Sequence, residues 1–551
     1  MKIVVADPIS ERGLELLRNT GWQVATPASA ALGRELAGAD GLVVRSATRV
    51  TSALLEQAPQ LRVVGRAGVG VDNIDLDAAT RRGVLVMNTP GGNAVSVAEH
   101  TFALLLALAR SVPQLHASTH AGRWEKSGAA GTELRSKTLG LVGLGRVGSE
   151  VARRARAFEM RVVAVDPYLS ENVMEELGVE RVSLDELLAR SDFVSLHTSL
   201  SPATEKIINR ETLAKMKRGA RLVNAARGEL VDEAALAEAL RSGHLAGVAL
   251  DVFAVEPPRN SPLVGLPNVI ATPHIAGSTE EAQEEVGYRI AQQVRDFLTE
   301  GVIRNAVNLP ALSAEQYRRL GPYLELAERL GSFVAQVAAG RASPLTRIRI
   351  RYAGEPAELG THLLRNAVLA GVLNTVLDEK ANLVNAAAIA AARGLAVEEH
   401  TRRRKHGFPD TLEVALAPAI PGERAEMAAQ EFAVEATVLH GTSPRVLSID
   451  GIELEAPLEG TLLLLRNRDV PGVIGQIGTV LGSRGVNIAT FALGRREAAM
   501  GAEAIALVRL DGDVPDSVVQ PILGIAAITE ARLVRLPRAA SSSVARSAAE
   551  G

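Results

Sequence analysis

The first part of the chain alternates short apolar runs with amphipathic stretches. The apolar runs, rich in Val, Ile and Leu, lie at residues 3–6, 41–45, 62–65 and 83–87 and have the length of buried strands. Helical stretches separate them, which is typical of a parallel sheet with crossover helices. A second series of the same kind runs from residue 137 to about 276. We therefore predict an α/β fold with two doubly wound parallel-sheet domains.

Two longer helices are predicted around the second series. Residues 96–110 have a dense apolar face, and Ser96 with Glu99 matches a capping box at the start of the helix. We expect this helix to be buried between domains or subunits. A charged helix is predicted at 278–298, and the polar, proline-terminated stretch 305–310 is interpreted as a linker.

Beyond residue 312 the pattern changes to that of an α+β domain. The predicted elements are a strand at 345–352, helices at 360–377 and 380–394, strands at 411–417 and 431–440, and a hairpin that turns at Asp450 and Gly451. The last folded segment, residues 461–536, has the order βαββαβ, which is a ferredoxin-like arrangement. The Ala- and Ser-rich tail at 537–551 is predicted to be disordered.

Composition narrows the chemistry that is open to these domains. The 551 residues include no cysteine, which excludes disulfides, thiolate metal sites and cysteine nucleophiles. Lys and Arg number 60 against 63 Asp and Glu, and the net charge of −3 provides no large field to attract nucleic acid or an anionic membrane. No signal peptide or membrane-length apolar stretch is apparent. We expect a cytoplasmic protein with no nucleic-acid partner, no membrane partner and no metal.

A glycine motif opens the second α/β series. Gly143, Gly145 and Gly148 form G-x-G-x-x-G between a predicted strand and a predicted helix. Glycine is needed because the chain turns sharply there and a pyrophosphate approaches bare backbone at the helix N-terminus. The next strand ends in Asp166, whose carboxylate would bind the ribose hydroxyls of NAD and repel the 2′-phosphate of NADP. NAD is the predicted cofactor, and a plain strand-to-helix turn is the alternative.

Three polar side chains follow later strands of the same series. Arg227 presents a planar guanidinium that can bind a carboxylate through two hydrogen bonds. Glu256 and His274 can form a pair in which the histidine takes a proton from an alcohol and returns it in the reverse reaction. Each residue taken singly suits an ordinary loop position. Their placement at successive strand ends favours catalysis by Arg227, Glu256 and His274.

These motifs together resemble one enzyme family. The segments 143–148, 224–228, 255–257 and 272–274 are similar to those of the D-isomer-specific 2-hydroxyacid dehydrogenase family, over residues 1 to about 305. The resemblance implies that Arg227 binds the substrate carboxylate and carbonyl, that His274 is the acid/base and that Glu256 pairs with it. The cofactor-binding residues then expected are Val69, Gly143, Gly145, Arg146, Val147, Gly148, Asp166, Thr198, Ala225, Ala226, Arg227, Asp251, His274, Ile275, Ala276 and Gly277.

Arginines at strand ends of the first domain indicate the charge of the substrate. Arg45, next to Ser46, and Arg66, in the loop that contains Gly68, can both face a cleft between the two α/β domains. With Arg227 they suit a doubly anionic, phosphate-bearing substrate. Interdomain salt bridges are the alternative. The substrate-binding residues expected are Arg45, Ser46, Arg66, Gly68, Arg227 and His274.

The remainder of the chain resembles two further modules. Residues 461–536 are similar to an ACT regulatory domain, and 312–451 to the intervening domain of the long-form D-3-phosphoglycerate dehydrogenases. This resemblance implies oxidation of 3-phospho-D-glycerate to 3-phosphohydroxypyruvate with NAD, the first step of L-serine biosynthesis. The alternatives are a related enzyme acting on glyoxylate, hydroxypyruvate or 2-oxoglutarate, and a nucleotide-sensing scaffold without activity.

The resemblance also divides the chain by role. It implies a substrate-binding domain at 1–95, completed by about 282–305, an NAD-binding domain at 96–281, an intervening allosteric or assembly domain at 312–451 and an ACT domain at 461–536.

Regulated members of the family bind L-serine between paired ACT domains, and the matching positions are Asn467, Asp469 and Asn487. Helix 96–110 and the ACT segment both favour a homo-oligomer, a dimer or a tetramer. The basic run 401–406 is interpreted as a solvated loop in preference to a site for an anionic effector.

Overall fold

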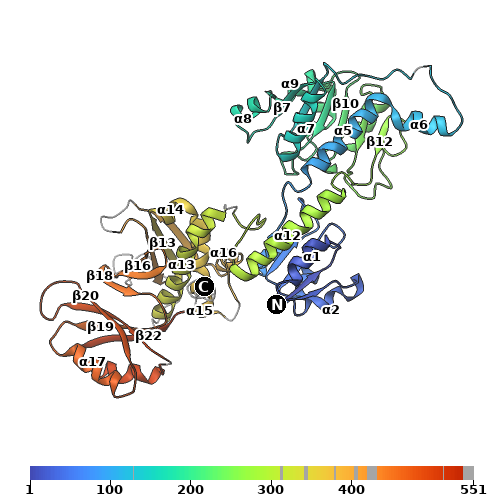
Figure 1. Cartoon of the computed structure of the whole chain (residues 1–551). Coiled ribbons are helices and arrows are strands. Elements are labelled where there is room, and N and C mark those ends of the chain that lie inside the picture. The colour runs from blue at the N-terminus through green and yellow to red at the C-terminus, as the bar shows by residue number, and fades with distance from the viewer. Residues whose placement is uncertain are drawn as a thin grey trace.

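In the computed structural model, the described residues form four folded units in an extended arrangement (Figure 1). The structure describes residues 1–127, 129–310, 314–339, 345–377, 380–402, 408–418, 431–512 and 514–537. The second α/β unit lies at one end, the first α/β unit in the middle, and the two C-terminal units at the other end. Most of the basic run 401–406 and the predicted tail from residue 538 lie outside the described residues.

The first unit is a parallel sheet with the strand order β2-β1-β3-β4-β5. Its strands are β1 (Lys2–Val5), β2 (Gln23–Ala25), β3 (Gly41–Val44), β4 (Val63–Arg66) and β5 (Leu85–Met87). Helices α1 (Glu11–Arg18) and α12 (Glu280–Glu300) pack on one face, and α2 (Leu32–Leu36), α3 (Ser52–Glu56) and α4 (Leu76–Arg81) on the other. Helix α12 follows the second unit in the sequence. The chain therefore returns to the first unit and completes it.

The second unit is a parallel sheet with the strand order β12-β11-β10-β9-β6-β7-β8. Its strands are β6 (Thr138–Val142), β7 (Arg161–Val165), β8 (Glu180–Arg181), β9 (Phe193–Leu196), β10 (Arg221–Asn224), β11 (Gly247–Leu250) and β12 (Val269–Ala271). Its helices are α5 (Ala94–Arg110), α6 (Val112–His120), α7 (Arg146–Ala157), α8 (Glu171–Glu176), α9 (Leu184–Arg190), α10 (Arg210–Lys215) and α11 (Glu233–Arg241). The strand order reverses between β6 and β9, and ligands bind open α/β sheets at the carboxyl ends of strands beside such a reversal.

Helix α5 corrects the predicted capping box. The helix begins at Ala94 with Asn93 as its N-cap, so Ser96 lies inside the first turn. The Ser96 hydroxyl lies 2.8 Å from Thr279 Oγ1, and Glu99 forms an ion pair with Arg154. The capping-box prediction is wrong because the serine hydroxyl binds a distant segment of the chain instead of its own helix end. Among the described residues no single helix passes a length and apolarity test for a membrane span; only α5 and α6 together do, bent by 65°.

Residues 305–310 also differ from the prediction. Ala306 forms an antiparallel bridge with Met87, and Val307 N donates to Val86 O at 2.8 Å. Asn308 Oδ1 accepts from Val86 N at 2.9 Å. The segment still joins the first unit to the third, but it is also fixed to β5, because it satisfies backbone groups that an edge strand leaves unpaired.

The third unit contains a mixed sheet with the order β14-β13-β15-β16-β17-β18. Its strands are β13 (Leu345–Ala353), β14 (Ala396–Thr401), β15 (Thr411–Pro418), β16 (Phe432–Leu439), β17 (Ser443–Ile449) and β18 (Ile452–Pro457), and its helices are α13 (Ala314–Ala338), α14 (Glu355–Leu359), α15 (Thr361–Val376) and α16 (Ala386–Ala392). The hairpin at Asp450 and Gly451 is confirmed, with φ positive at both residues. The sequence missed α13, which contains Pro322, and β14, and it overestimated the length of α16.

The fourth unit confirms the βαββαβ order. Its elements are β19 (Thr461–Arg468), α17 (Val473–Gly482), β20 (Ile488–Arg495), β21 (Glu503–Leu510), α18 (Val519–Leu523) and β22 (Ile528–Arg535), and the sheet order is β20-β21-β19-β22. One face of this sheet shares a core with α13 of the third unit, through Leu462, Leu464 and Ile505. Arg466 joins the two units by pairing with Asp450 of the β17–β18 turn. The predicted fold class is confirmed.

Candidate active site

Three neighbouring parallel strands bring the predicted catalytic residues to one edge of the second sheet. Arg227 follows β10, Glu256 follows β11 and His274 follows β12, and these strands lie side by side. His274 Nδ1 lies 2.8 Å from Glu256 Oε2, and the two side chains are 53% and 38% exposed. The pair is therefore formed in the structure and is open to a ligand.

Gly228 allows the loops that carry Arg227 and Glu256 to meet. A Cβ at Gly228 would overlap the backbone of Phe253. The buried Asn224 holds the turn, because its Nδ2 donates to Arg227 O at 2.8 Å and its Oδ1 accepts from Ala226 N at 3.0 Å. Since backbone atoms cannot yield as a side chain can, this contact requires glycine and sets the position of Arg227.

Asp251 lies beneath the loop that carries His274. Its carboxylate is buried and accepts hydrogen bonds from Ile275 N at 2.9 Å and Ala276 N at 2.8 Å. Burial raises the pKa of this carboxyl group, but hydrogen bonds from His100, Thr272 and the two amides outweigh it and hold the pKa at about 2. Both carboxylate oxygens thus bind this loop, a role that sequence reasoning, which placed Asp251 at the cofactor, missed.

Three arginines meet where the first two units face each other. Arg227 Nη2 lies 3.1 Å from Asp72 Oδ2, on the glycine-rich loop that follows β4. Burial, followed by the positive charge of Arg227, lowers the pKa of Arg66, and Arg45 acts in the same direction. The buried Nε of Arg66 has no hydrogen-bond partner among the described residues, and a Cβ at Gly68 would overlap its guanidinium. An anionic ligand would stabilise this arginine cluster.

The loop of Arg45 is held by two residues that sequence reasoning missed. Asp7 is buried and accepts from Arg45 N at 2.6 Å and from Thr48 Oγ1 at 2.7 Å. Asn73 donates to Arg45 O at 2.7 Å. Ser46, the next residue of this loop, is exposed. The sequence did contain a signal for the role of Asp7, which stands two residues after the end of β1. Short polar side chains at strand ends commonly bind nearby loop amides.

The glycine-rich turn links β6 to α7. Gly143 has a φ of +93°, and a Cβ there would lie 2.7 Å from His197 O, while a Cβ at Gly148 would overlap Gly143 O. No atom of the described residues lies within 4 Å of a Cβ built on Gly145. Asp166 Oδ2 accepts from Leu144 N at 2.9 Å, so the acid after β7 lies beside the turn. Two glycines serve the turn itself, and the third faces open space at the N-terminus of α7, which fits a pyrophosphate.

The other residues predicted to bind the cofactor lie around this turn or near the two segments that connect the first unit to the second. Thr198 follows β9 beside Gly143, Val147 lies in the first turn of α7, and Arg146 donates to Pro90 O of one connecting segment. Ala225 and Ala226 lie in the turn before Arg227, Ile275 is exposed beside His274, Gly277 packs against Asn93, and Val69 is exposed with its carbonyl accepting from Asn88.

His197 lies behind the glycine-rich turn and predicts a pH effect on stability. Burial lowers the pKa of its imidazole to about 4, whereas an unfolded histidine titrates near 6.5. As the pH falls below 6.5 the unfolded chain gains a proton that the folded chain does not, so stability falls until the pH reaches about 4. Between about pH 7 and 5 the wild type should lose roughly 2 kcal/mol relative to His197→Gln in urea unfolding. Parallel pH profiles of the two proteins would contradict this assignment.

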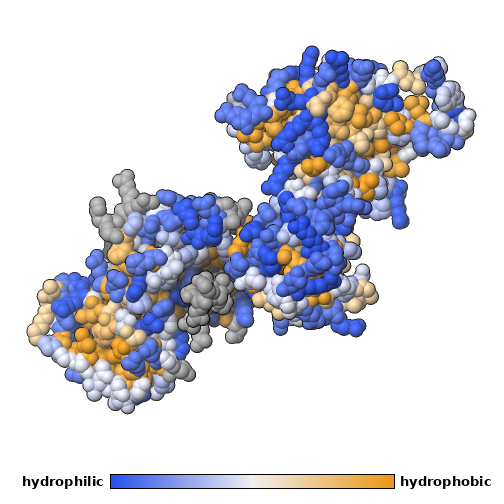
Figure 2. Space-filling model, in the orientation of Figure 1, coloured by the Kyte–Doolittle hydropathy of each residue, from blue (hydrophilic) through white to orange (hydrophobic). Residues whose placement is uncertain are grey.

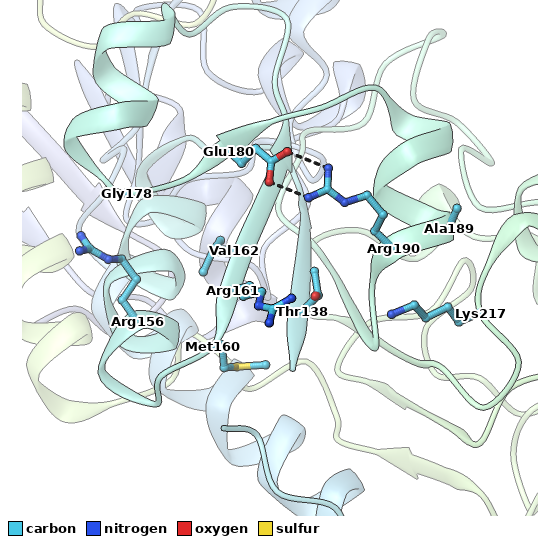
Figure 3. A pocket seen from close by; sticks show the side chains of 10 residues that line it. All are labelled: Thr138, Arg156, Met160, Arg161, Val162, Gly178, Glu180, Ala189, Arg190 and Lys217. Carbon is cyan, nitrogen blue, oxygen red and sulfur yellow. Dashed lines mark hydrogen bonds and ion pairs between the residues drawn. The ribbon is translucent and has the colours of Figure 1, made fainter. Parts of the chain in front are cut away.

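A separate hollow of about 520 Å³ lies on the second unit (Figure 3). Its lining includes Thr138 and Arg161, at the amino ends of β6 and β7, and a two-hydrogen-bond pair between Arg190 and Glu180. The glycine-rich turn is at the opposite, carboxyl end of β6. This hollow is therefore not part of the candidate active site.

The predicted effector residues do not converge within one chain. Asn467 pairs with Ala504 near the start of β21, and Asp469 is the first residue after β19. Asn487 precedes β20, and its Nδ2 donates at 2.7 Å to Asp511, beyond the other end of β21. Asn467 and Asp469 therefore lie at the opposite end of the sheet from Asn487. A site that uses all three needs two chains.

Models of known protein families match three parts of the chain. Residues 102–276 match the D-isomer specific 2-hydroxyacid dehydrogenase, NAD binding domain, residues 319–450 match the D-3-phosphoglycerate dehydrogenase intervening domain, and residues 461–526 match the ACT domain. These matches confirm the family resemblance that the motifs indicated. They also confirm NAD as the cofactor predicted from the glycine-rich turn.

Individual proteins extend the similarity to nearly the whole chain. D-3-phosphoglycerate dehydrogenase of Bacillus subtilis is 40% identical over 97% of this chain and 100% of its own length, and that of Methanocaldococcus jannaschii is 42% identical over the same shares. The structure of D-lactate dehydrogenase from Aquifex aeolicus, complexed with NAD and lactic acid, is 32% identical and covers 56% of this chain and 100% of its own, with a TM-score of 0.50.

Proposed function

Because this chain belongs to the D-3-phosphoglycerate dehydrogenase family, we propose that it oxidises 3-phospho-D-glycerate to 3-phosphohydroxypyruvate with NAD, the first step of L-serine biosynthesis. The observation that carries the choice of substrate is the cluster of Arg45, Arg66 and Arg227, where three positive charges face the carboxylates of Asp7 and Asp72. A substrate with a carboxylate and a phosphate can engage all three guanidinium groups, whereas glyoxylate and hydroxypyruvate each present a single carboxylate.

The chemistry is assigned to residues of both α/β units. Arg227 binds the substrate carboxylate, and Arg45 and Arg66 bind the phosphate. His274 is the base: its Nδ1 is held by Glu256, so its Nε2 is free to take the hydroxyl proton. The carboxylate of Glu256 stabilises the imidazolium that results. When bound, NAD supplies the acceptor for the hydride.

Steady-state kinetics test this proposal against its alternatives. The reduction of NAD should depend on 3-phosphoglycerate, and reduction of 3-phosphohydroxypyruvate should be much faster than reduction of glyoxylate or 2-oxoglutarate at equal concentrations. Turnover of glyoxylate without turnover of the phosphorylated substrate would assign the chain a different substrate. No turnover of any 2-hydroxyacid, with NADH still bound, would favour a nucleotide-sensing scaffold.

Gly145 offers a test of the cofactor site that separates binding from folding. Its φ is negative and a Cβ there meets no atom in the part of the chain that the structure describes, so Gly145→Ala should leave the melting temperature unchanged. The same methyl group would occupy space beside the proposed pyrophosphate, and we expect the Kd for NADH to rise about tenfold or more, the loss of roughly one charge-assisted hydrogen bond. Fluorescence titration with NADH measures this change. An unaltered Kd would place the pyrophosphate elsewhere.

We propose a division of the chain by role and a homo-oligomeric assembly. Residues 1–95 with 282–305 bind substrate, 96–281 bind NAD, 312–451 serve regulation or assembly, and 461–536 act as the regulatory domain. Hydrophobic residues gather on the surface over α5 (Figure 2), and Val95, Val112 and Trp124 are among the exposed large side chains. Such a surface favours pairing of two chains, and a dimer or tetramer is the expected state. A cytoplasmic location stays a prediction of the sequence.

L-Serine is the proposed effector of the ACT domain. Asn467 is buried, and its Oδ1 has no hydrogen-bond partner among the described residues, which supports a polar ligand at this position. Calorimetry should detect serine binding to the native enzyme, and Asn467→Ala should abolish the heat because the Oδ1 acceptor is removed. The same heat in both proteins would exclude Asn467 from the effector site, and no heat in either would leave the ACT domain as an assembly element.

A further inference from the structure

The backbone of His274 has an uncommon conformation. Its φ is +55°, in the left-handed region that only a few per cent of non-glycine residues adopt. Asp251 holds this conformation: its backbone oxygen accepts from His274 N at 2.9 Å, and its carboxylate accepts from the two amides that follow. The position of the imidazole therefore depends on how firmly Asp251 is itself held.

Helix α5 binds both ends of the loop that carries His274. Ser96 and His100 are four residues apart and so lie on one face of the helix. The Ser96 hydroxyl contacts Thr279 Oγ1 at 2.8 Å, and His100 Nε2 lies 3.1 Å from Thr272 Oγ1. The loop from residue 272 to 279 is thus attached to α5 before and after His274.

The hydrogen bonds at Thr272 define the part that His100 plays. Thr272 Oγ1 donates to Asp251 Oδ1 at 2.6 Å, so its lone pairs are left to accept a hydrogen bond from His100 Nε2. His100 Nε2 also lies 3.4 Å from the same Asp251 oxygen. A donor at this point orients both the hydroxyl and the buried carboxylate. A chain of hydrogen bonds thus connects His100 on α5, through Thr272 and Asp251, to the backbone of His274.

We propose that His100 is a positioning residue for His274, acting through Thr272 and Asp251. This inference rests on the proposed role of His274 as the base. Glu256 orients the imidazole ring, and His100 secures the backbone from which the ring projects. Proton transfer is sensitive to misplacement of the base by about 1 Å, which can cost about a hundredfold in rate. Neither substrate nor cofactor needs to touch His100 for this effect.

The test compares His100→Leu with His100→Gln. Leucine fills similar space without a donor, whereas the glutamine amide can still donate to Thr272. For His100→Leu we expect kcat to fall by about 10- to 100-fold with KM values for both substrates little changed, and for His100→Gln most of kcat to return. Thr272→Val should reproduce the loss, and Glu99→Gln on the same helix, which alters only the ion pair with Arg154, serves as the control.

Hydrogen exchange supplies a readout that does not depend on turnover. In His100→Leu the amides of Ile275 and Ala276 should exchange faster than in the wild type, while the rest of the second unit keeps its protection. The proposal is overturned if kcat of His100→Leu matches the wild type, if His100→Gln is as slow as His100→Leu, if the loss lies in KM alone, or if exchange at these amides is unchanged. A wild type that fails to oxidise 3-phosphoglycerate would refute the proposed function, and the exchange comparison would still test the positioning role.

Discussion

His274→Asn is expected to lower kcat by about 10²- to 10⁴-fold, the usual contribution of a general acid/base, while the Kd for NADH stays near that of the wild type. The asparagine amide cannot take the hydroxyl proton, yet asparagine tolerates the left-handed backbone at this position, so the loop should keep its shape. The reaction should be slow in both directions, because the same group returns the proton in reduction. Steady-state kinetics and fluorescence titration with NADH measure the two quantities.

A matched control is available at His440, in the turn between β16 and β17. Its φ is +54°, nearly that of His274, and it lies in the third unit. His440→Asn therefore makes the same chemical change in the same backbone conformation. Because His440 lies in a different unit from the candidate active site, this variant should leave kcat unchanged. A His274→Asn enzyme with undiminished hydride transfer would remove the mechanism proposed for this chain.

Arg227→Lys is expected to lower kcat/KM by about 10²- to 10³-fold, although the positive charge is kept. Lysine cannot form the planar pair of hydrogen bonds that a guanidinium makes with a carboxylate, and each bond to a charged group contributes about 1.5–3 kcal/mol. The shorter reach of the ammonium should also weaken the contact with Asp72 of the first unit. The loss should fall mainly on KM, because the arginine holds the substrate carboxylate equally in the ground state and in the transition state.

Arg210→Lys provides the comparison for this variant. Arg210 pairs with Glu238 on the surface of the second unit, where both side chains are well exposed. The same replacement there should leave kcat/KM within about twofold, since exposed ion pairs contribute little. If Arg227→Lys also stayed within this range, the substrate carboxylate would have to bind to another group.

Much of the fold follows from local pattern. The buried strands β1, β3, β6 and β9 are short runs of Val, Leu and Ile, and the hairpin at Asp450 and Gly451 requires two residues that tolerate positive φ. Helix α13 escaped prediction because Pro322 lies inside it, where a proline normally argues against a helix. Its apolar face is stabilised by the sheet of the third unit, which no local pattern reveals.

The sequence alone also identified the candidate site, because its chemistry stands in short motifs at strand ends. The glycine-rich turn, Asp166, Arg227, Glu256 and His274 each follow a strand of one sheet. Parallel strands end at a common edge, so residues that are far apart in the chain are expected to meet there. The pair formed by His274 and Glu256 is found at that edge.

Only the tertiary structure decided which residues hold the candidate active site in place. It also decided that the predicted effector residues do not meet within one chain. Ser96 was predicted to cap its own helix and instead binds Thr279, and Asp251, predicted beside the cofactor, has the further role of binding the loop of His274. Asn467 and Asn487 were predicted to bind an effector between paired ACT domains, and within one chain they lie at opposite ends of the sheet. The physical reason is the same in each case. A short polar side chain can bind its own backbone, a distant loop or a ligand at similar cost, and only the packing of elements far apart in sequence determines which partner is within reach.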